Sequence, residues 1–154
     1  MSFVQELKNK ILNENYVTTR EDAIKLLDAD LDDLTKAADE IREKLHGKDF
    51  DFCSIINGRS GRCSENCKYC AQSSYYHTGA PEYKLLSAEE ILADAKKREA
   101  ADIPRYSIVT SGRTLTSNDV EQISETIRRI KKETKLSVCL SSGLLNLEQF
   151  DKLR

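Results

Sequence analysis

Residues 106–140 read YSIVTSGRTLTSNDVEQISETIRRIKKETKLSVCL, and this stretch decides the fold. Short runs with β-branched residues open and close it, at 106–110 and 136–140, and each has the character of a strand. Between them, apolar residues at helical spacing predict an amphipathic helix that Thr116 or Ser117 can cap. These apolar positions are Val120, Ile123, Ile127 and Ile130. A strand, a helix and a second strand in this order predict parallel strands joined by a right-handed crossover.

The same alternation continues on both sides of this stretch. Residues 50–56 have the apolar, aromatic and β-branched character of a first strand, and a long loop over 57–81 follows it. Ser87 and Glu90 form a capping box that starts a helix, and Asn146 caps another helix after the third strand. A complete (β/α)8 barrel takes roughly 250 residues. The predicted fold class is therefore α/β, with the first three β/α units of a TIM-type barrel, incomplete in this chain, and we expect a fragment of a longer protein.

Residues 1–49 read as helices that pack on one another, a separate N-terminal segment ahead of the partial barrel at 50–154. Thr18 with Glu21 has the T-x-x-E pattern of a helix start, and Gly47 ends the helical run. The apolar positions expected to pack together are Val4, Leu7, Ile11, Ile24, Leu27, Leu31, Leu34, Ala38, Ile41 and Leu45.

The composition excludes several classes of protein. With 39% hydrophobic and 32% charged residues, the chain is globular and not disordered. A net charge of -2, with Lys and Arg dispersed among acidic residues, argues against a nucleic-acid surface and favours small-molecule partners. No stretch reaches the ~18 apolar residues of a membrane span, and no apolar signal segment opens the chain. We therefore expect a cytoplasmic protein without a membrane anchor.

A compact cysteine motif lies in the long loop, where Cys63, Cys67 and Cys70 have the spacing C-x-x-x-C-x-x-C. Cysteines this close together in a reducing compartment indicate metal or redox chemistry more than disulfides. Thiolates are the natural ligands of iron–sulfur clusters, and three thiolates leave one iron of a [4Fe–4S] cluster free to chelate an amino and a carboxylate group. The loop follows the first strand, at the barrel end where active sites lie. A structural zinc site, completed by His77 or Cys53, is the alternative.

The motif and its surroundings resemble a known family. An aromatic residue, Tyr69, precedes the last cysteine, as in radical S-adenosylmethionine (SAM) enzymes, and the flanks are similar to the biotin synthase family among them. The resemblance covers nearly the whole chain. It rests on Asn57, Ser60-Gly61, Glu65 to Ser73, Tyr76 to Gly79, Arg105-Tyr106, Val109 to Arg113 and Val138-Cys139.

The resemblance implies an activity and its cofactors. Such an enzyme reductively cleaves SAM to a 5′-deoxyadenosyl radical, abstracts hydrogens from dethiobiotin and inserts sulfur to form biotin. It uses a [4Fe–4S] cluster, SAM and an electron donor such as flavodoxin or ferredoxin, and it commonly forms a homodimer. Another radical SAM enzyme of the hydrogenase-maturation type, or a zinc-binding module without catalysis, is the alternative function.

The resemblance also implies roles for single residues. Cys63, Cys67 and Cys70 would hold the radical-generating cluster, while Tyr69 would pack near the adenine of SAM. The methionine part of SAM would lie against the strand end at 110–112, for which a plain strand-to-helix turn is the alternative. The three residues there are Thr110, Ser111 and Gly112.

A second iron–sulfur cluster, [2Fe–2S] or a variant, is implied as well, held in the family by three cysteines and an arginine. Alternation along the strands predicts that Ser107 and Cys139 both point away from the helices. Cys139 matches a family ligand position, whereas Ser107 stands where many relatives have cysteine. A serine hydroxyl is a much poorer ligand than a thiolate. Ser107 would therefore ligate weakly, the cluster would be of another type, or Cys53 would substitute.

Overall fold

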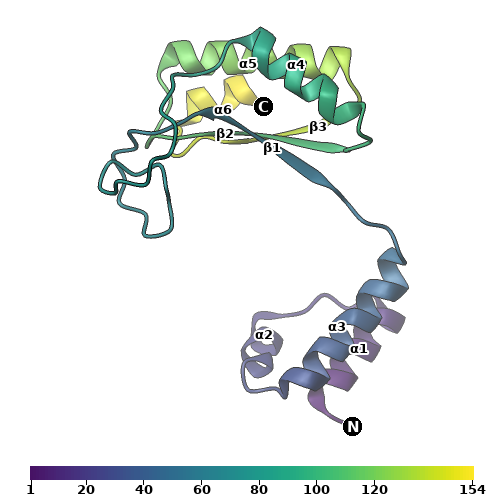
Figure 1. The fold of residues 1–154 in the computed structure, drawn as a ribbon. Helices are drawn as coiled ribbons and strands as arrows, with labels where there is room; N and C mark the ends of the chain where they lie inside the picture. Colours follow the sequence, from purple (N-terminus) through teal and green to yellow (C-terminus); the bar gives the residue numbers. More distant parts are fainter. The chain divides into compact units, whose positions relative to one another are not determined.

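The computed structural model describes all 154 residues, which divide into two compact units at 1–50 and 51–154. The first unit holds three helices, α1 (Phe3–Glu14), α2 (Arg20–Leu26) and α3 (Leu31–His46), drawn in purple and blue in Figure 1. Helices α1 and α3 pack side by side. The residues buried between them are Val4, Leu7 and Ala37.

The prediction of which apolar residues pack together in this unit was wrong in part. Ile24, Leu27 and Leu31 are 53%, 82% and 70% exposed, and α2 buries none of its residues. On α3 the fully buried position is Ala37, one residue before the expected Ala38. Helical spacing alone identifies an apolar stripe, but it does not say whether a partner element covers that stripe.

The start of α2 also differs from its expectation by one residue. Its N-cap is Thr19, whose hydroxyl oxygen accepts from the N–H of Asp22, and the Asp22 carboxylate accepts from the N–H of Thr19 at 3.0 Å. The predicted Thr18–Glu21 pair is therefore wrong. Aspartate can close a capping box as glutamate does, so two adjacent candidates competed at this helix start.

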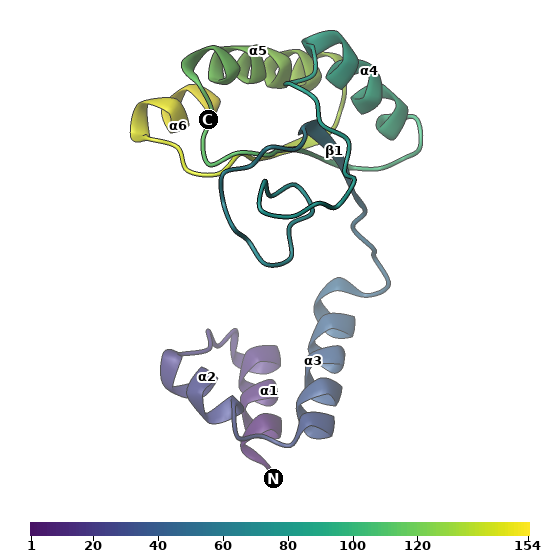
Figure 2. The same cartoon turned by 60° about the vertical axis from the view of Figure 1, so that its left-hand side comes forward.

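The second unit is a parallel three-stranded sheet in the order β1 (Cys53–Arg59), β2 (Arg105–Thr110), β3 (Ser137–Ser141). Three helices alternate with the strands and lie on one face of the sheet (Figures 1 and 2): α4 (Ala88–Glu99), α5 (Ser117–Glu133) and α6 (Leu147–Leu153). The predicted alternation of strands and helices is confirmed. Strand β1 begins at Cys53, three residues later than expected, because its pairing with β2 begins opposite Arg105.

The core of this unit lies between the sheet and helices α4 and α5. Tyr106 and Ile108 project from β2 against Ile91, Ala95 and Ile130, and all five side chains are 0% exposed. The Tyr106 hydroxyl donates to the Asp94 carboxylate at 3.0 Å. Burial, with Asp94 as the second cause, raises the pKa of Tyr106 well above its ordinary value and keeps the hydroxyl neutral.

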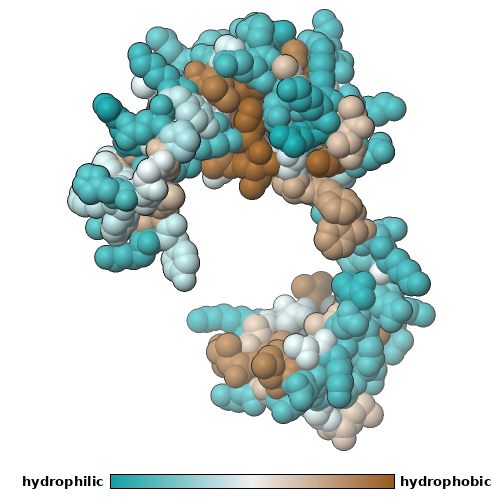
Figure 3. All heavy atoms as spheres, in the orientation of Figure 1, coloured by the Kyte–Doolittle hydropathy of each residue, from teal (hydrophilic) through white to brown (hydrophobic).

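The opposite face of the sheet is open. Ile55 is 63% exposed there, and Cys139 is exposed as well, which confirms the predicted alternation in β3. Figure 3 shows apolar atoms reaching the surface in the middle of the second unit. No helix of the structure combines the length and the apolarity that a membrane crossing requires.

Candidate iron–sulfur site

The cysteine loop leaves β1 at its C-terminal end and returns to it before α4 begins. Ser60 pairs with Tyr83 as an antiparallel bridge, and the N–H of Leu86 donates to the carbonyl of Gly58 at 2.8 Å. The Tyr83 hydroxyl donates to the Asn57 carbonyl at 2.7 Å. Both ends of the loop are therefore fixed on the same strand end.

Backbone hydrogen bonds wind the loop around the cysteines. The N–H of Cys63 donates to the carbonyl of Gln72 at 3.0 Å, and the N–H of Ser74 donates to the carbonyl of Cys63 at 2.9 Å. The N–H of Cys70 donates to the carbonyl of Cys67 at 3.0 Å and closes a turn. The main chain thus brings the three cysteines onto one short, closed loop.

The three thiols differ in exposure, and their side chains are not gathered into a metal-binding group. Cys63 is buried, Cys70 is half-buried and Cys67 is exposed, and none forms a disulfide. The structure contains no cluster of three or more Cys, His, Asp or Glu side chains arranged to hold a metal ion. Neither His77 nor Cys53, the fourth ligands considered for zinc, is therefore gathered with them.

The donor set nevertheless fits an iron–sulfur cluster. Three free thiols within one hydrogen-bonded loop are the soft ligands that such clusters take, and the Cys67–Cys70 turn holds two of them one turn apart. Tyr69, between them in this turn, is fully exposed. Its predicted contact with adenine stays a prediction.

The strand end at 110–112 lies directly against the start of the cysteine loop. Thr110 and Ser111 are buried, at 8% and 7% exposure, and the Ser111 hydroxyl donates to the carbonyl of Gly61 at 2.9 Å. The Thr110 hydroxyl oxygen is buried without any hydrogen-bond partner. The structure therefore brings two of the predicted site segments together, although they are 50 residues apart in sequence.

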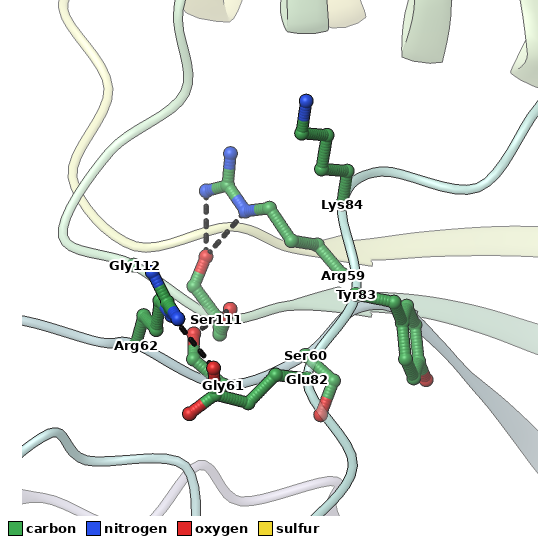
Figure 4. A pocket seen from close by; sticks show the side chains of 9 residues that line it. All are labelled: Arg59, Ser60, Gly61, Arg62, Glu82, Tyr83, Lys84, Ser111 and Gly112. Carbon is green, nitrogen blue, oxygen red and sulfur yellow. Dashed lines mark hydrogen bonds and ion pairs between the residues drawn. The ribbon is translucent and has the colours of Figure 1, made fainter.

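A cleft of about 370 Å³ opens between the cysteine loop and the end of β2 (Figure 4). Arg62 and Glu82 form an ion pair on its rim at 2.6 Å, and this pair raises the pKa of Arg62. The residues that line the cleft are Arg59, Ser60, Gly61, Arg62, Glu82, Tyr83, Lys84, Ser111 and Gly112.

Two contacts of charged residues organise this region, and neither was predicted from the sequence. Arg59 bonds to the segment after β2 through its guanidinium, and Glu65 in the cysteine loop forms an ion pair with Arg113 at 2.9 Å. Both contacts join segments about 50 residues apart. No local pattern marked Arg59, because its partners lie 52 or more residues later in the sequence.

The residues considered for a second cluster lie on the open face of the sheet. Ser107 of β2 pairs in register with Cys139 of β3, so these two are neighbours. Cys53 of β1 pairs in register with Arg105, which lies two residues before Ser107 on β2. The guanidinium of Arg105 contacts the Asp51 carboxylate, which is the main cause of its raised pKa, and Cys139 contributes to the same shift.

Comparisons with known proteins identify the superfamily of the chain. The profile of the radical SAM superfamily matches residues 57–154. The chain belongs to the radical SAM superfamily. Membership implies a [4Fe–4S] cluster and SAM as cofactors, as the cysteine motif predicts.

Within the superfamily, the chain is similar to curated biotin synthases. It is 46% identical to biotin synthase 2 of Corynebacterium diphtheriae, over 99% of this chain and 46% of that protein. Identity is 45% to biotin synthase of Brachyspira hyodysenteriae, over 98% of this chain and 45% of that protein. It is 46% to biotin synthase of Akkermansia muciniphila, over 100% of this chain and 48% of that protein. The chain spans about half the length of these relatives.

A solved structure shares the fold. The crystal structure of HydG, a maturase of the [FeFe]-hydrogenase, matches with a TM-score of 0.71 over 98% of this chain and 34% of that chain. The two sequences are 22% identical, so the likeness concerns the fold.

Proposed function

We propose that this protein carries out the biotin synthase reaction, in which SAM is cleaved reductively and sulfur is inserted into dethiobiotin. The identity to curated biotin synthases along the whole chain supports this specific activity. The structural observation that supports its SAM-cleaving step is the hydrogen bond from the Ser111 hydroxyl to Gly61, which joins the cysteine loop to the end of β2. A cluster on that loop and SAM on that strand end would lie side by side.

The residues of this chain have distinct roles in the proposal. Cys63, Cys67 and Cys70 would hold the [4Fe–4S] cluster, which when bound supplies the electron for SAM cleavage. The strand end at 110–112 would orient the methionine part of SAM, and Tyr69 would cover the adenine. The loop would hold its cysteines at the end of β1, since its two ends are fixed on that strand.

The proposal also includes the fold of the complete enzyme, its electron donor and its assembly. The three β/α units of residues 50–154 would be the first units of a (β/α)8 barrel, preceded by the helical segment 1–49. We also propose flavodoxin or ferredoxin as the electron donor and a homodimer as the assembly. Five free cysteines favour a reducing compartment such as the cytoplasm.

The open face of the sheet would hold the second cluster. Cys139 is the proposed ligand, and its neighbour Ser107 is a weaker one because a hydroxyl gives up its proton far less readily than a thiol. Among residues 1–154, Cys139 is therefore the main proposed ligand of the second cluster.

Product analysis separates the roles of the two sets of cysteines. We expect replacement of Cys67 by Ala to abolish formation of 5′-deoxyadenosine from SAM, because the radical-generating cluster loses a ligand. The matched variant Cys139→Ala should still form 5′-deoxyadenosine but no biotin from dethiobiotin. Retained 5′-deoxyadenosine formation in Cys67→Ala would contradict the assignment of the cluster, and a wild-type protein that cleaves SAM but leaves dethiobiotin unchanged would contradict the substrate.

A further inference from the structure

Arg59 is the last residue of β1 and follows a β-bulge. The bulge determines on which face of the sheet the Arg59 side chain lies. Asn57 is two residues earlier, and in a regular strand the two side chains would share the open face. The pairing instead skips Gly58, because Asn57 pairs with Val109 and Arg59 pairs with Thr110. The inserted residue reverses the alternation, so the Arg59 side chain lies on the side of the helices.

The guanidinium of Arg59 makes four hydrogen bonds, three to the segment between β2 and α5 and one to Asp119 in the first turn of α5. Nε and Nη2 both donate to the carbonyl oxygen of Ser111, at 2.9 and 2.6 Å, as Figure 4 shows. Nη2 also donates to the carbonyl of Thr114 at 3.1 Å. Nη1 forms an ion pair with the Asp119 carboxylate at 3.0 Å, and both side chains are only 20% exposed.

These bonds fix one peptide group of the proposed SAM site. The N–H of Ser111 donates to the carbonyl of Arg59 at 2.9 Å, and the Ser111 hydroxyl donates to Gly61, so Ser111 is held at three atoms. Gly112 has φ +101°, and a Cβ there would lie 2.7 Å from Nη2 of Arg59. The guanidinium therefore packs directly on the peptide between residues 111 and 112.

We propose that Arg59 is a positioning residue, which fixes the peptide between Ser111 and Gly112 against the cysteine loop and thereby sets the affinity for SAM. This inference rests on the proposed function. The C=O and N–H of a trans peptide point in opposite directions. Anchoring the Ser111 carbonyl on the guanidinium therefore also directs the N–H of Gly112 away from it.

A lysine at this position cannot make the same set of bonds. The guanidinium is a planar fork with five donors, and here it reaches two carbonyls and one carboxylate at once. An ammonium group presents its three donors from a single point. Arg59→Lys therefore keeps the positive charge near Asp119 but loses part of the anchoring of residue 111.

The test measures SAM binding and cluster content separately. The full-length wild-type protein and its Arg59→Lys variant are loaded anaerobically with iron and sulfide, and SAM affinity is taken from the change that SAM causes in the EPR spectrum of the reduced cluster. We expect iron content to stay unchanged and the Kd for SAM to rise about tenfold, which corresponds to the loss of about one hydrogen bond at the anchor. The matched control is Arg129→Lys, because Arg129 forms its ion pairs with Glu89 and Glu133, away from the site, and should leave the Kd unchanged.

Each outcome decides between the inference and its alternatives. An unchanged Kd in Arg59→Lys would overturn the inference, and so would a loss of iron in proportion to the loss of SAM binding. A wild-type protein that does not bind SAM would overturn the proposed function instead. If Arg59→Lys does not fold, Asp119→Asn tests the same anchor, and we expect a smaller rise of the Kd; no rise there would overturn the inference.

Discussion

The buried hydroxyl of Thr110 is the clearest single-residue feature of the site, because its oxygen has no hydrogen-bond partner in the protein. Removing such a group does not cost a protein hydrogen bond. We expect Thr110→Val to leave the free energy of unfolding unchanged or to raise it by up to about 1 kcal/mol. Denaturant unfolding without SAM measures this change.

The matched variant is Thr126→Val, in which the same substitution removes a satisfied hydroxyl. Thr126 is 0% exposed, and its hydroxyl donates to the carbonyl of Gln122 at 2.7 Å. We expect this variant to lose about 1 kcal/mol of stability. An equal loss in both variants would show that the Thr110 hydroxyl has a partner in the protein. A weaker affinity for SAM in Thr110→Val alone would support the cofactor role of Thr110.

Local sequence predicts some site residues and conceals others. The spacing of Cys63, Cys67 and Cys70 is a local pattern, so it is visible without a structure. The contact of Arg59 with Ser111 depends on the register of two strands and on the bulge at Gly58. A one-residue shift in a strand moves a side chain to the other face, and no short-range pattern predicts where such a shift occurs.

The turn between β3 and α6 lies very close to the loop between β2 and α5, at the same end of the sheet. Gly143 has φ +75°, and a Cβ there would lie 2.4 Å from the carbonyl oxygen of Arg113 in the preceding loop. We expect Gly143→Ala to destabilise the protein by roughly 2–3 kcal/mol, because backbone strain and a backbone clash add together.

The control for this turn is Gly79→Ala, in the cysteine loop. Gly79 has φ +70°, but a Cβ there would meet nothing within 4 Å. We expect a loss of only about 1 kcal/mol, the cost of the left-handed backbone conformation alone. Denaturant midpoints measure both variants, and equal losses would contradict the close approach of the two loops.

The elements of the second unit were predicted better than those of the first. In 51–154 helices α4 and α5 cover the sheet, so their apolar stripes and their burial coincide, as for Val120 and Ile123 of α5, whereas α6 buries none of its residues. In 1–50 the apolar positions of α2 lie in solvent, and the stripe there has no partner within its own unit. Periodicity predicts a helix in both cases, but burial depends on the surrounding elements.

Among larger features, the parallel sheet is covered by the helices of its own unit on one face only. Parallel sheets are ordinarily covered on both faces, or closed into a barrel whose interior is filled by side chains. The open face carries Ile55, Ser107 and Cys139 in one row across the three strands. This row is where the proposed barrel interior and second cluster site would lie.

Metal and sulfide analysis with an absorption spectrum shows directly whether the cysteine loop holds an iron–sulfur cluster. The protein is purified without oxygen and reconstituted with iron and sulfide. We expect about four iron and four sulfide per chain on the loop of Cys63, Cys67 and Cys70, in addition to the iron of the second cluster, with a brown colour that bleaches on reduction. Replacing Cys63 by Ala should remove the four iron of the loop. Stoichiometric zinc in a colourless protein, held by the same cysteines, would contradict the iron–sulfur cluster.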